Sequence, residues 1–168
     1  MRSIGDDHRE PEGLKPSRFG SLVARRLFYM PVEPDSSQKP SQGLVLIVDD
    51  DPVFISQLTN ILVERGYLVL GAKDGHAALG LLNQHEFNFS LAIIDVFLPM
   101  SNGFDLISKL SAKKDNLKII AVSIGRQKVL ETAISLGADA GVAKAQGGTP
   151  LDAGQWLNEV FLQIGLPA

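Results

Sequence analysis

Four short apolar runs in this sequence lead into side chains that could do chemistry. Asp49 and Asp50 follow the first run, Asp95 ends another, and Ser123 and Lys144 end the last two. Carboxylates that gather together repel one another, and a hard divalent ion with oxygen ligands, such as Mg²⁺, keeps them ionised. An aspartate can attack phosphorus, while a hydroxyl and an ammonium group suit the oxygens of a phosphoryl group. If these side chains meet, the chemistry they predict is phosphoryl transfer onto Asp95.

The stretch around Asp95 predicts where that carboxylate lies. Leu91 to Ile94 is an unbroken apolar run, which is typical of a strand buried on both faces. Pro99 and Gly103 follow closely and indicate a tight loop. Because ligands bind at the carboxyl ends of the strands in open parallel α/β sheets, Asp95 is expected at such a binding edge.

From Gly43 onward, apolar runs alternate with helical patterns. Strands are predicted at residues 44–48, 67–72, 91–95, 117–123 and 140–143. Helices are predicted at residues 52–65, from 74 through 82, and at 103–113, 127–136 and 151–164. Asp51 before Pro52 is expected to cap the first helix. Strands that are apolar on both faces and alternate with helices predict an open, doubly wound α/β fold with a parallel sheet.

Residues 1–43 differ from the rest and are predicted to be an extension and linker before a domain at 44–168. Five prolines exclude one long helix through this part: Pro11, Pro16, Pro31, Pro34 and Pro40. Apolar residues at three- and four-residue steps favour a short amphipathic helix from Ser17 to Met30. A disordered tail with a chance stripe is an open alternative to a helix that docks on the domain, on a second copy or on a partner.

The composition excludes several classes of protein. The chain has 168 residues, 45% of them hydrophobic and 21% charged, and a net charge of -3, which fits a globular domain and does not predict a nucleic-acid binder. Without Cys there is no disulfide, thiolate zinc site or cysteine nucleophile. The longest aliphatic run, Leu44 to Val48, is far shorter than the roughly 20 residues of a membrane span. No secretory signal is recognisable, so the cytoplasm is the expected location.

The order of these residues resembles the receiver domain of two-component response regulators. The shared pattern is Asp-Asp after the first strand, Asp-x-x-x-Pro and then Gly after the third, Ser ending the fourth and Lys ending the fifth. The resemblance covers about residues 43–166 and is to single-domain receivers of the chemotaxis-regulator kind. It implies a flavodoxin-like fold with a five-stranded parallel sheet in the order 2-1-3-4-5.

The resemblance also implies a role for each site residue. Asp95 would be the phosphoacceptor, and the remaining roles fall to two groups of residues. The expected Mg²⁺ ligands are Asp49, Asp50, Asp95 and the backbone carbonyl of Phe97, and the expected partners of the phosphoryl group are Ser123 and Lys144. Phosphorylation and dephosphorylation would be self-catalysed, so the chain is not expected to be an enzyme that acts on an outside metabolite.

The expected partners follow from the same resemblance. A sensor histidine kinase or a phosphotransfer protein would supply the phosphoryl group. No output domain is expected after the last helix. The signal is therefore expected to pass to a downstream protein by direct contact, and a homodimer is one form that this contact could take. Neither nucleic acid nor a membrane is expected as a partner.

Three positions depart from the pattern of the family. Gly141 stands where Tyr or Phe is usual, Ala145 stands where Pro is usual after Lys144, and Asn102 stands where Asp is commonest. The first two favour an alternative function, a receiver-like interaction or dimerisation module that works without phosphorylation. A second alternative, a Mg²⁺-dependent aspartyl-phosphate phosphatase, needs another Asp where this chain has Phe97. A bulky Phe97 also predicts that an acyl phosphate on the neighbouring Asp would be shielded from water and live longer.

Overall fold

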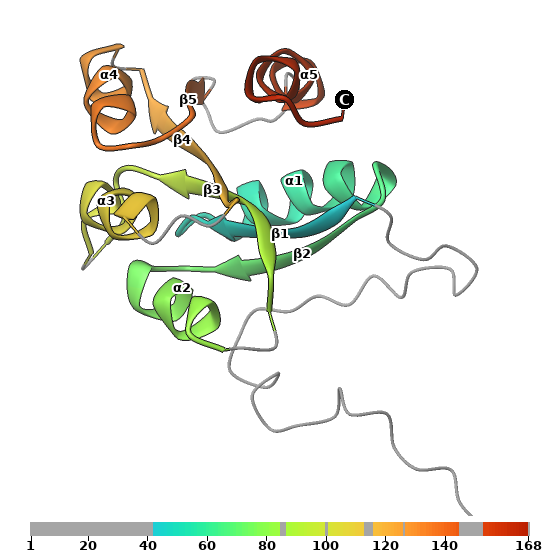
Figure 1. The fold of residues 1–168 in the computed structure, drawn as a ribbon, viewed down its shortest axis with the longest axis horizontal. Coiled ribbons are helices and arrows are strands. Elements are labelled where there is room, and N and C mark those ends of the chain that lie inside the picture. The colour runs from blue at the N-terminus through green and yellow to red at the C-terminus, as the bar shows by residue number, and fades with distance from the viewer. Residues whose placement is uncertain are drawn as a thin grey trace, which may run out of the picture.

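The computed structural model describes residues 42–84, 87–99, 101–112, 116–125, 127–144 and 153–167. Strands and helices alternate along them in the order β1 (Gly43–Val48), α1 (Pro52–Glu64), β2 (Tyr67–Ala72), α2 (Gly75–Leu82), β3 (Phe89–Asp95), α3 (Gly103–Ala112), β4 (Lys118–Ile124), α4 (Gln127–Ser135), β5 (Ala140–Lys144) and α5 (Ala153–Ile164). The strands form one parallel sheet in the order β2-β1-β3-β4-β5 (Figure 1). This confirms the predicted fold class and strand order.

Helices cover both faces of the sheet (Figure 1). α1 and α5 pack on one face, and α2, α3 and α4 pack on the other. Because successive strand residues point to opposite faces, β3 gives Ala92 and Ile94 to one core and Leu91 and Ile93 to the other. All four are fully buried, which explains why the sequence of this strand is apolar without interruption.

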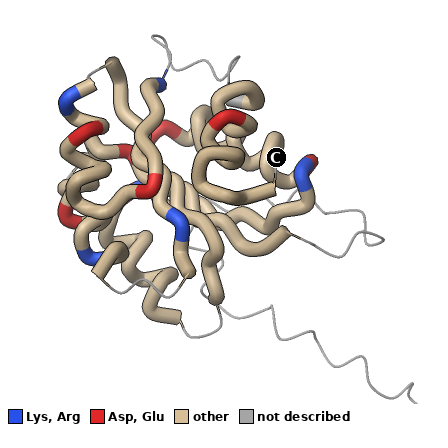
Figure 2. Tube along the Cα trace, turned by 45° about the horizontal axis from the view of Figure 1, so that its top comes forward, with Lys and Arg blue, Asp and Glu red and all other residues tan. Residues whose placement is uncertain are grey.

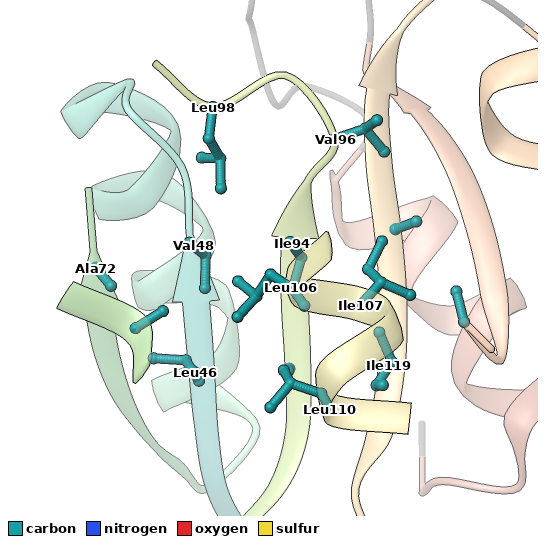
Figure 3. Close-up of a cluster of buried hydrophobic side chains, with 14 of the residues drawn as sticks. Leu46, Val48, Ala72, Ile94, Val96, Leu98, Leu106, Ile107, Leu110 and Ile119 are labelled. Carbon is teal, nitrogen blue, oxygen red and sulfur yellow. The ribbon is translucent and has the colours of Figure 1, made fainter. Parts of the chain in front are cut away.

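The core on the α2, α3 and α4 face extends to the strand ends that carry the acidic residues. Figure 3 shows Val48 and Ile94 pointing into this core near Leu106. These two residues immediately precede Asp49 and Asp95 in the chain. Burying a Val or Ile side chain contributes about 1.5–3 kcal/mol, so their burial holds the register of β1 and β3 and with it the position of both carboxylates.

The starts of α1 and α2 are set by aspartate caps. The side chain of Asp51 accepts a hydrogen bond of 2.8 Å from Val53 N, and Pro52 occupies the first turn of α1, as predicted. The side chain of Asp74 likewise accepts one of 2.8 Å from Ala77 N at the start of α2. Asp51 therefore has a structural role at the helix end.

Several element boundaries differ slightly from the predicted ones. α1 ends at Glu64, β4 continues past Ser123 to Ile124, and β5 includes Lys144. The predicted helix from Ser17 to Met30 and the position of Ala145 lie outside the described residues. Among the helices in the described ranges, none has the length and apolar character needed to cross a membrane.

Candidate functional site

Lys144 joins two carboxylates at the carboxyl edge of the sheet. Its Nζ lies 2.5 Å from Asp49 Oδ2 and also forms an ion pair with Asp95 Oδ2. Asp49 directly follows β1, Asp95 ends β3 and Lys144 ends β5, with β4 between the last two strands. Because parallel strands end at the same edge, the fold brings together charges that are far apart in the sequence, as the sequence predicts.

Asp50 adds a third carboxylate to this cluster. One carboxylate oxygen each from Asp49, Asp50 and Asp95 lies within 4.8 Å of the others. Asp49 and Asp95 are buried, whereas Asp50 is exposed. Mg²⁺ prefers carboxylate oxygens and keeps several water ligands, which the exposed Asp50 side of the cluster allows. The donor set therefore fits a hard divalent cation.

Burial and ion pairing act in opposite directions on the charges of this site. Burial raises the pKa of Asp49 to about 6, although the hydrogen bond and charge of Lys144 and the hydrogen bond from Asp51 N act to lower it. For Lys144, burial opposes the charged form, but the hydrogen bonds and charges of Asp49 and Asp95 outweigh it and raise the pKa. The ammonium of Lys144 therefore stays charged at neutral pH. Its Nζ lies 4.4 Å from the ring centroid of Phe54, which gives the charge a cation–π contact as well.

The backbone after β3 fixes the orientation of Asp95. Phe97 N donates a hydrogen bond of 2.8 Å to Asp95 Oδ1, which leaves Oδ2 for Lys144. The loop then returns so closely that a Cβ at Gly103 would lie 2.3 Å from the backbone oxygen of Asp95. A side chain at Gly103 would displace the strand end, so the glycine permits the tight loop that the sequence predicts. The side chain of Phe97 is 55% exposed.

Ser123 supplies a buried hydroxyl near this edge. In the register of the sheet, Asp95 pairs with Val122, so Ser123 lies one residue closer to the carboxyl edge, next to Ala143. Ser123 is fully buried, and its Oγ has no hydrogen-bond partner among the residues that the structure describes. Leaving a buried hydroxyl unpaired costs about 1–3 kcal/mol, which a bound oxygen-rich group would relieve.

Two contacts near the site were not predicted from the sequence. Ser101 Oγ accepts a hydrogen bond of 3.0 Å from Gly75 N, which ties the loop after β3 to the start of α2. At β5, a Cβ on Gly141 would lie 2.9 Å from Leu130 Cβ and 3.6 Å from Ile134 Cδ1, so α4 packs directly over this glycine. No local pattern signals either contact, because the partners belong to different elements.

Comparison with known proteins places this arrangement in a family. Residues 45–152 match the response regulator receiver domain family, and the chain belongs to that family. The response regulator GtcR of Aneurinibacillus migulanus is 34% identical over 100 residues, which make up 60% of this chain and 40% of that protein. The chain spans between 15% and 40% of the length of this and two other similar curated response regulators.

Solved structures agree with this assignment. A CheY-like receiver domain protein from Methanospirillum hungatei superimposes with a TM-score of 0.62 and 27% identity, covering 74% of this chain and 98% of that one. A chain from the CheX-CheY-BeF3-Mg²⁺ complex of Borrelia burgdorferi gives a TM-score of 0.62 and 26% identity, covering 71% of this chain and 87% of that one. The predicted family is thereby confirmed.

Proposed function

We propose that this receiver domain accepts a phosphoryl group on Asp95 with the help of Mg²⁺ and signals by contact with another protein. The observation that carries the proposal is the ion pairing of one ammonium, on Lys144, with the carboxylates of both Asp49 and Asp95. A purely structural ion pair needs one carboxylate for one ammonium, and burying a further carboxylate is costly. Two buried carboxylates on one ammonium, with a third beside them, suit a site that binds a cation and a phosphoryl group.

The proposed reaction makes one bond and breaks one. A carboxylate oxygen of Asp95 attacks the phosphorus of a phosphohistidine on a sensor kinase or phosphotransfer protein. The imidazole, protonated on its other nitrogen, leaves with the electron pair of the P–N bond, and an acyl phosphate forms on Asp95. The reaction is self-catalysed in that the receiver supplies both the nucleophile and the groups that stabilise the transferred charge.

Each remaining site residue has a role in this proposal. Lys144 pairs with a phosphoryl oxygen, and the unpaired hydroxyl of Ser123 donates a hydrogen bond to another. Asp49, Asp50, Asp95 and the backbone carbonyl of Phe97 would hold Mg²⁺. When bound, Mg²⁺ neutralises charge on the carboxylates and on the transferred oxygens.

The proposed partners are proteins and the proposed location is the cytoplasm. Figure 2 shows Lys and Arg interspersed with Asp and Glu along the trace, and the net charge of -3 does not favour nucleic acid as a partner. The similar Borrelia burgdorferi structure contains a CheY with CheX, BeF3 and Mg²⁺. By analogy, we propose a downstream protein as the target of this receiver, with a second copy of the chain as one form that this contact could take.

Intact-protein mass spectrometry after incubation with Mg²⁺ and acetyl phosphate tests the proposal. The native chain should gain one base-labile phosphoryl group, and Asp95→Asn should gain none. Asp51→Asn is the matched control, because it also removes one carboxylate beside the site but keeps a side chain that can cap α1. This control should label like the native chain. An equal adduct on Asp95→Asn, or none on the native chain, would refute the proposal.

The phosphorylation-independent interaction module is the second candidate, and the packing at Gly141 favours it. α4 packs against Gly141, which stands where receiver domains usually have Tyr or Phe, so this position offers no aromatic side chain that could change orientation on phosphorylation. Light scattering of the native chain before and after phosphorylation separates the two candidates, together with amide exchange in α4 and β5. The interaction module predicts the same oligomeric mass and the same amide exchange before and after phosphorylation. The phosphorylation-dependent receiver predicts a change in at least one of these two quantities.

A further inference from the structure

The outer edge of β2 lacks the features that usually protect an exposed strand. β2 is the last strand of the sheet and pairs with β1 alone among the described strands (Figure 1). Tyr67 to Ala72 contains no charge and no proline, and its pairing with β1 has no bulge. Charges, prolines and bulges commonly protect the edge strands of natural proteins from pairing with other strands. An edge strand that lacks them is a site where another strand can add to the sheet.

The hydrogen bonds of β2 identify which backbone groups are free. Asp49 N donates to Ala72 O at 3.0 Å, so the backbone groups of Ala72 face β1. Since this direction alternates along a strand, the N–H and C=O groups of Tyr67, Val69 and Gly71 face outward. Within the described ranges, the structure shows no hydrogen bond to these outward groups. Leu68, on the same strand, is 45% exposed.

We propose that residues 28–32 of this same chain pair with the outer edge of β2 as an antiparallel strand. The segment from residue 27 to 32 reads Leu-Phe-Tyr-Met-Pro-Val, an uncharged apolar run in the 41 residues that precede the described part. Aromatic and β-branched residues favour strands. The chain enters the fold at Gly43, which pairs with Tyr67, so the preceding segment is tethered beside the start of β2. A short tether raises the effective concentration of the segment at this edge.

The proline in this segment fits one pairing register. With Phe28, Met30 and residue 32 facing β2, Pro31 faces outward, where its missing N–H costs no hydrogen bond. In this register, Phe28 pairs with Gly71, Met30 pairs with Val69, and residue 32 pairs with Tyr67. The side chains of residues 29 and 31 then lie on the face of Leu68 and Leu70, where they would cover the exposed part of Leu68.

The chain between this strand and β1 is long enough. The proposed strand and β1 flank β2, so their ends are two strand spacings apart, or about 10 Å. Residues 33–42 connect them and can span up to about 33 Å when extended. An antiparallel segment ends at the same end of the sheet at which β1 begins, so no crossover is needed. The proposal also requires that the helix predicted from Ser17 end before residue 28.

Amide hydrogen exchange measured by NMR on the full chain tests the proposal. In the native chain, the amides of Tyr67, Val69 and Gly71 should exchange at least about tenfold more slowly than in Phe28→Pro, which removes an inward N–H. The inward amides of Leu68 and Leu70 serve as the internal standard and should not change. A change in these as well would show that the substitution disturbs the sheet itself.

Tyr29→Pro is the matched control. It also replaces an aromatic residue by proline, but at a neighbouring position whose N–H would face outward, so protection of the β2 edge should remain. Fast exchange of the outward amides in the native chain, or equal protection in Phe28→Pro, would overturn the proposal. Protection that grows with protein concentration would also overturn it, because the occupant would then be a second copy of the chain.

Discussion

At the ends of β1 and β3, two buried carboxylates share one ammonium, whereas at β5 a glycine lies directly under α4. The first region, which we call the acidic site, consists of Asp49, Asp50, Asp95 and Lys144. The second, the α4–β5 contact, consists of Leu130, Ile134 and Gly141. The acidic site depends on where charges are placed, and the α4–β5 contact depends on how closely two elements approach. A substitution should therefore act mainly through electrostatics in one region and mainly through packing in the other.

The largest effect is expected from Lys144→Met, which keeps the volume of the side chain but removes its charge. The carboxylates of Asp49 and Asp95 would stay buried without their cation, and breaking such a pair typically costs about 3–5 kcal/mol. We expect the free energy of unfolding at pH 8 without Mg²⁺ to fall by about 3 kcal/mol in a urea titration. Added Mg²⁺ should recover part of this loss, because it also balances the carboxylate charge.

Lys118→Met is the control for that experiment. Lys118 pairs with Asp139 at 3.4 Å, but its side chain is 38% exposed. Exposed ion pairs are worth about 0–1 kcal/mol, so the same substitution should change stability much less here. Equal losses for the two variants would show that the charge shared at the acidic site has no special energetic role.

The next effect concerns the pH dependence of Mg²⁺ binding. Because burial raises the pKa of Asp49 to about 6, protons compete with the metal below that pH. Apparent Mg²⁺ affinity should fall by up to about tenfold per pH unit between pH 6 and 5, or about 1.4 kcal/mol. Calorimetric titrations at pH 5, 6 and 7 would measure this fall, and the control Asp51→Asn should show the same profile.

Without metal, lowering the pH has the opposite effect at Asp49: it stabilises the folded state. A raised pKa means that the folded state binds the proton more tightly than the unfolded state does. The stability that Asp49 contributes is therefore complete below its ordinary pKa of about 4 and is lost as the pH rises through about 6. Between pH 7 and 5, acidification should thus favour the metal-free fold at this residue while weakening Mg²⁺ binding. Similar Mg²⁺ affinity at pH 5 and 7 would contradict the assignment of Asp49 as a ligand.

In the α4–β5 contact, Gly141→Ala tests packing without any change of charge. The added Cβ would lie 2.9 Å from Leu130 Cβ, so α4 or β5 must shift. Overpacking usually costs about 1–3 kcal/mol, partly offset by the smaller entropy loss of Ala compared with Gly, so we expect a net loss of about 1 kcal/mol. Gly80→Ala is the control, since a Cβ there has no neighbour within 4 Å and should stabilise α2. A stabilising Gly141→Ala would show that α4 moves freely from β5.

The two regions also differ in how far the sequence predicts them. Apolar runs that end in Asp95, Ser123 and Lys144 were sufficient to predict a parallel sheet and the shared edge, because parallel topology brings strand ends together whatever the detailed packing. The strand order came from the resemblance to receiver domains, and the structure confirms it. Absence of an aromatic at Gly141 could also be read directly. That α4 approaches this glycine could not be read, because the approach depends on the angle and depth of a helix that packs from elsewhere in the chain.

The contact between Ser101 and α2 escaped prediction for the same reason. Ser101 lies in the loop after β3 and Gly75 is the first residue of α2, so their hydrogen bond depends on how these two segments pack together. Asp51, in contrast, was predicted correctly as a cap because its hydrogen bond to Val53 lies within one helix turn. Local contacts and strand ends can thus be read from sequence, whereas contacts between layers require the packed structure.

The smallest effect on stability, but a distinct kinetic one, is expected from Phe97→Asn beside the acidic site. The side chain of Phe97 is 55% exposed, so its replacement should change the free energy of unfolding by about 0.5 kcal/mol or less. An amide next to an acyl phosphate can hold an attacking water by hydrogen bonds, whereas a phenyl ring excludes water, so decay of the phosphorylated protein should become severalfold faster. Mass spectrometry of the phosphoryl adduct over time measures its half-life. Leu162→Asn on α5 is the control, because it makes the same kind of apolar-to-polar change at a 72% exposed position away from the site. An unchanged half-life in Phe97→Asn would mean that the ring does not shield Asp95 from water.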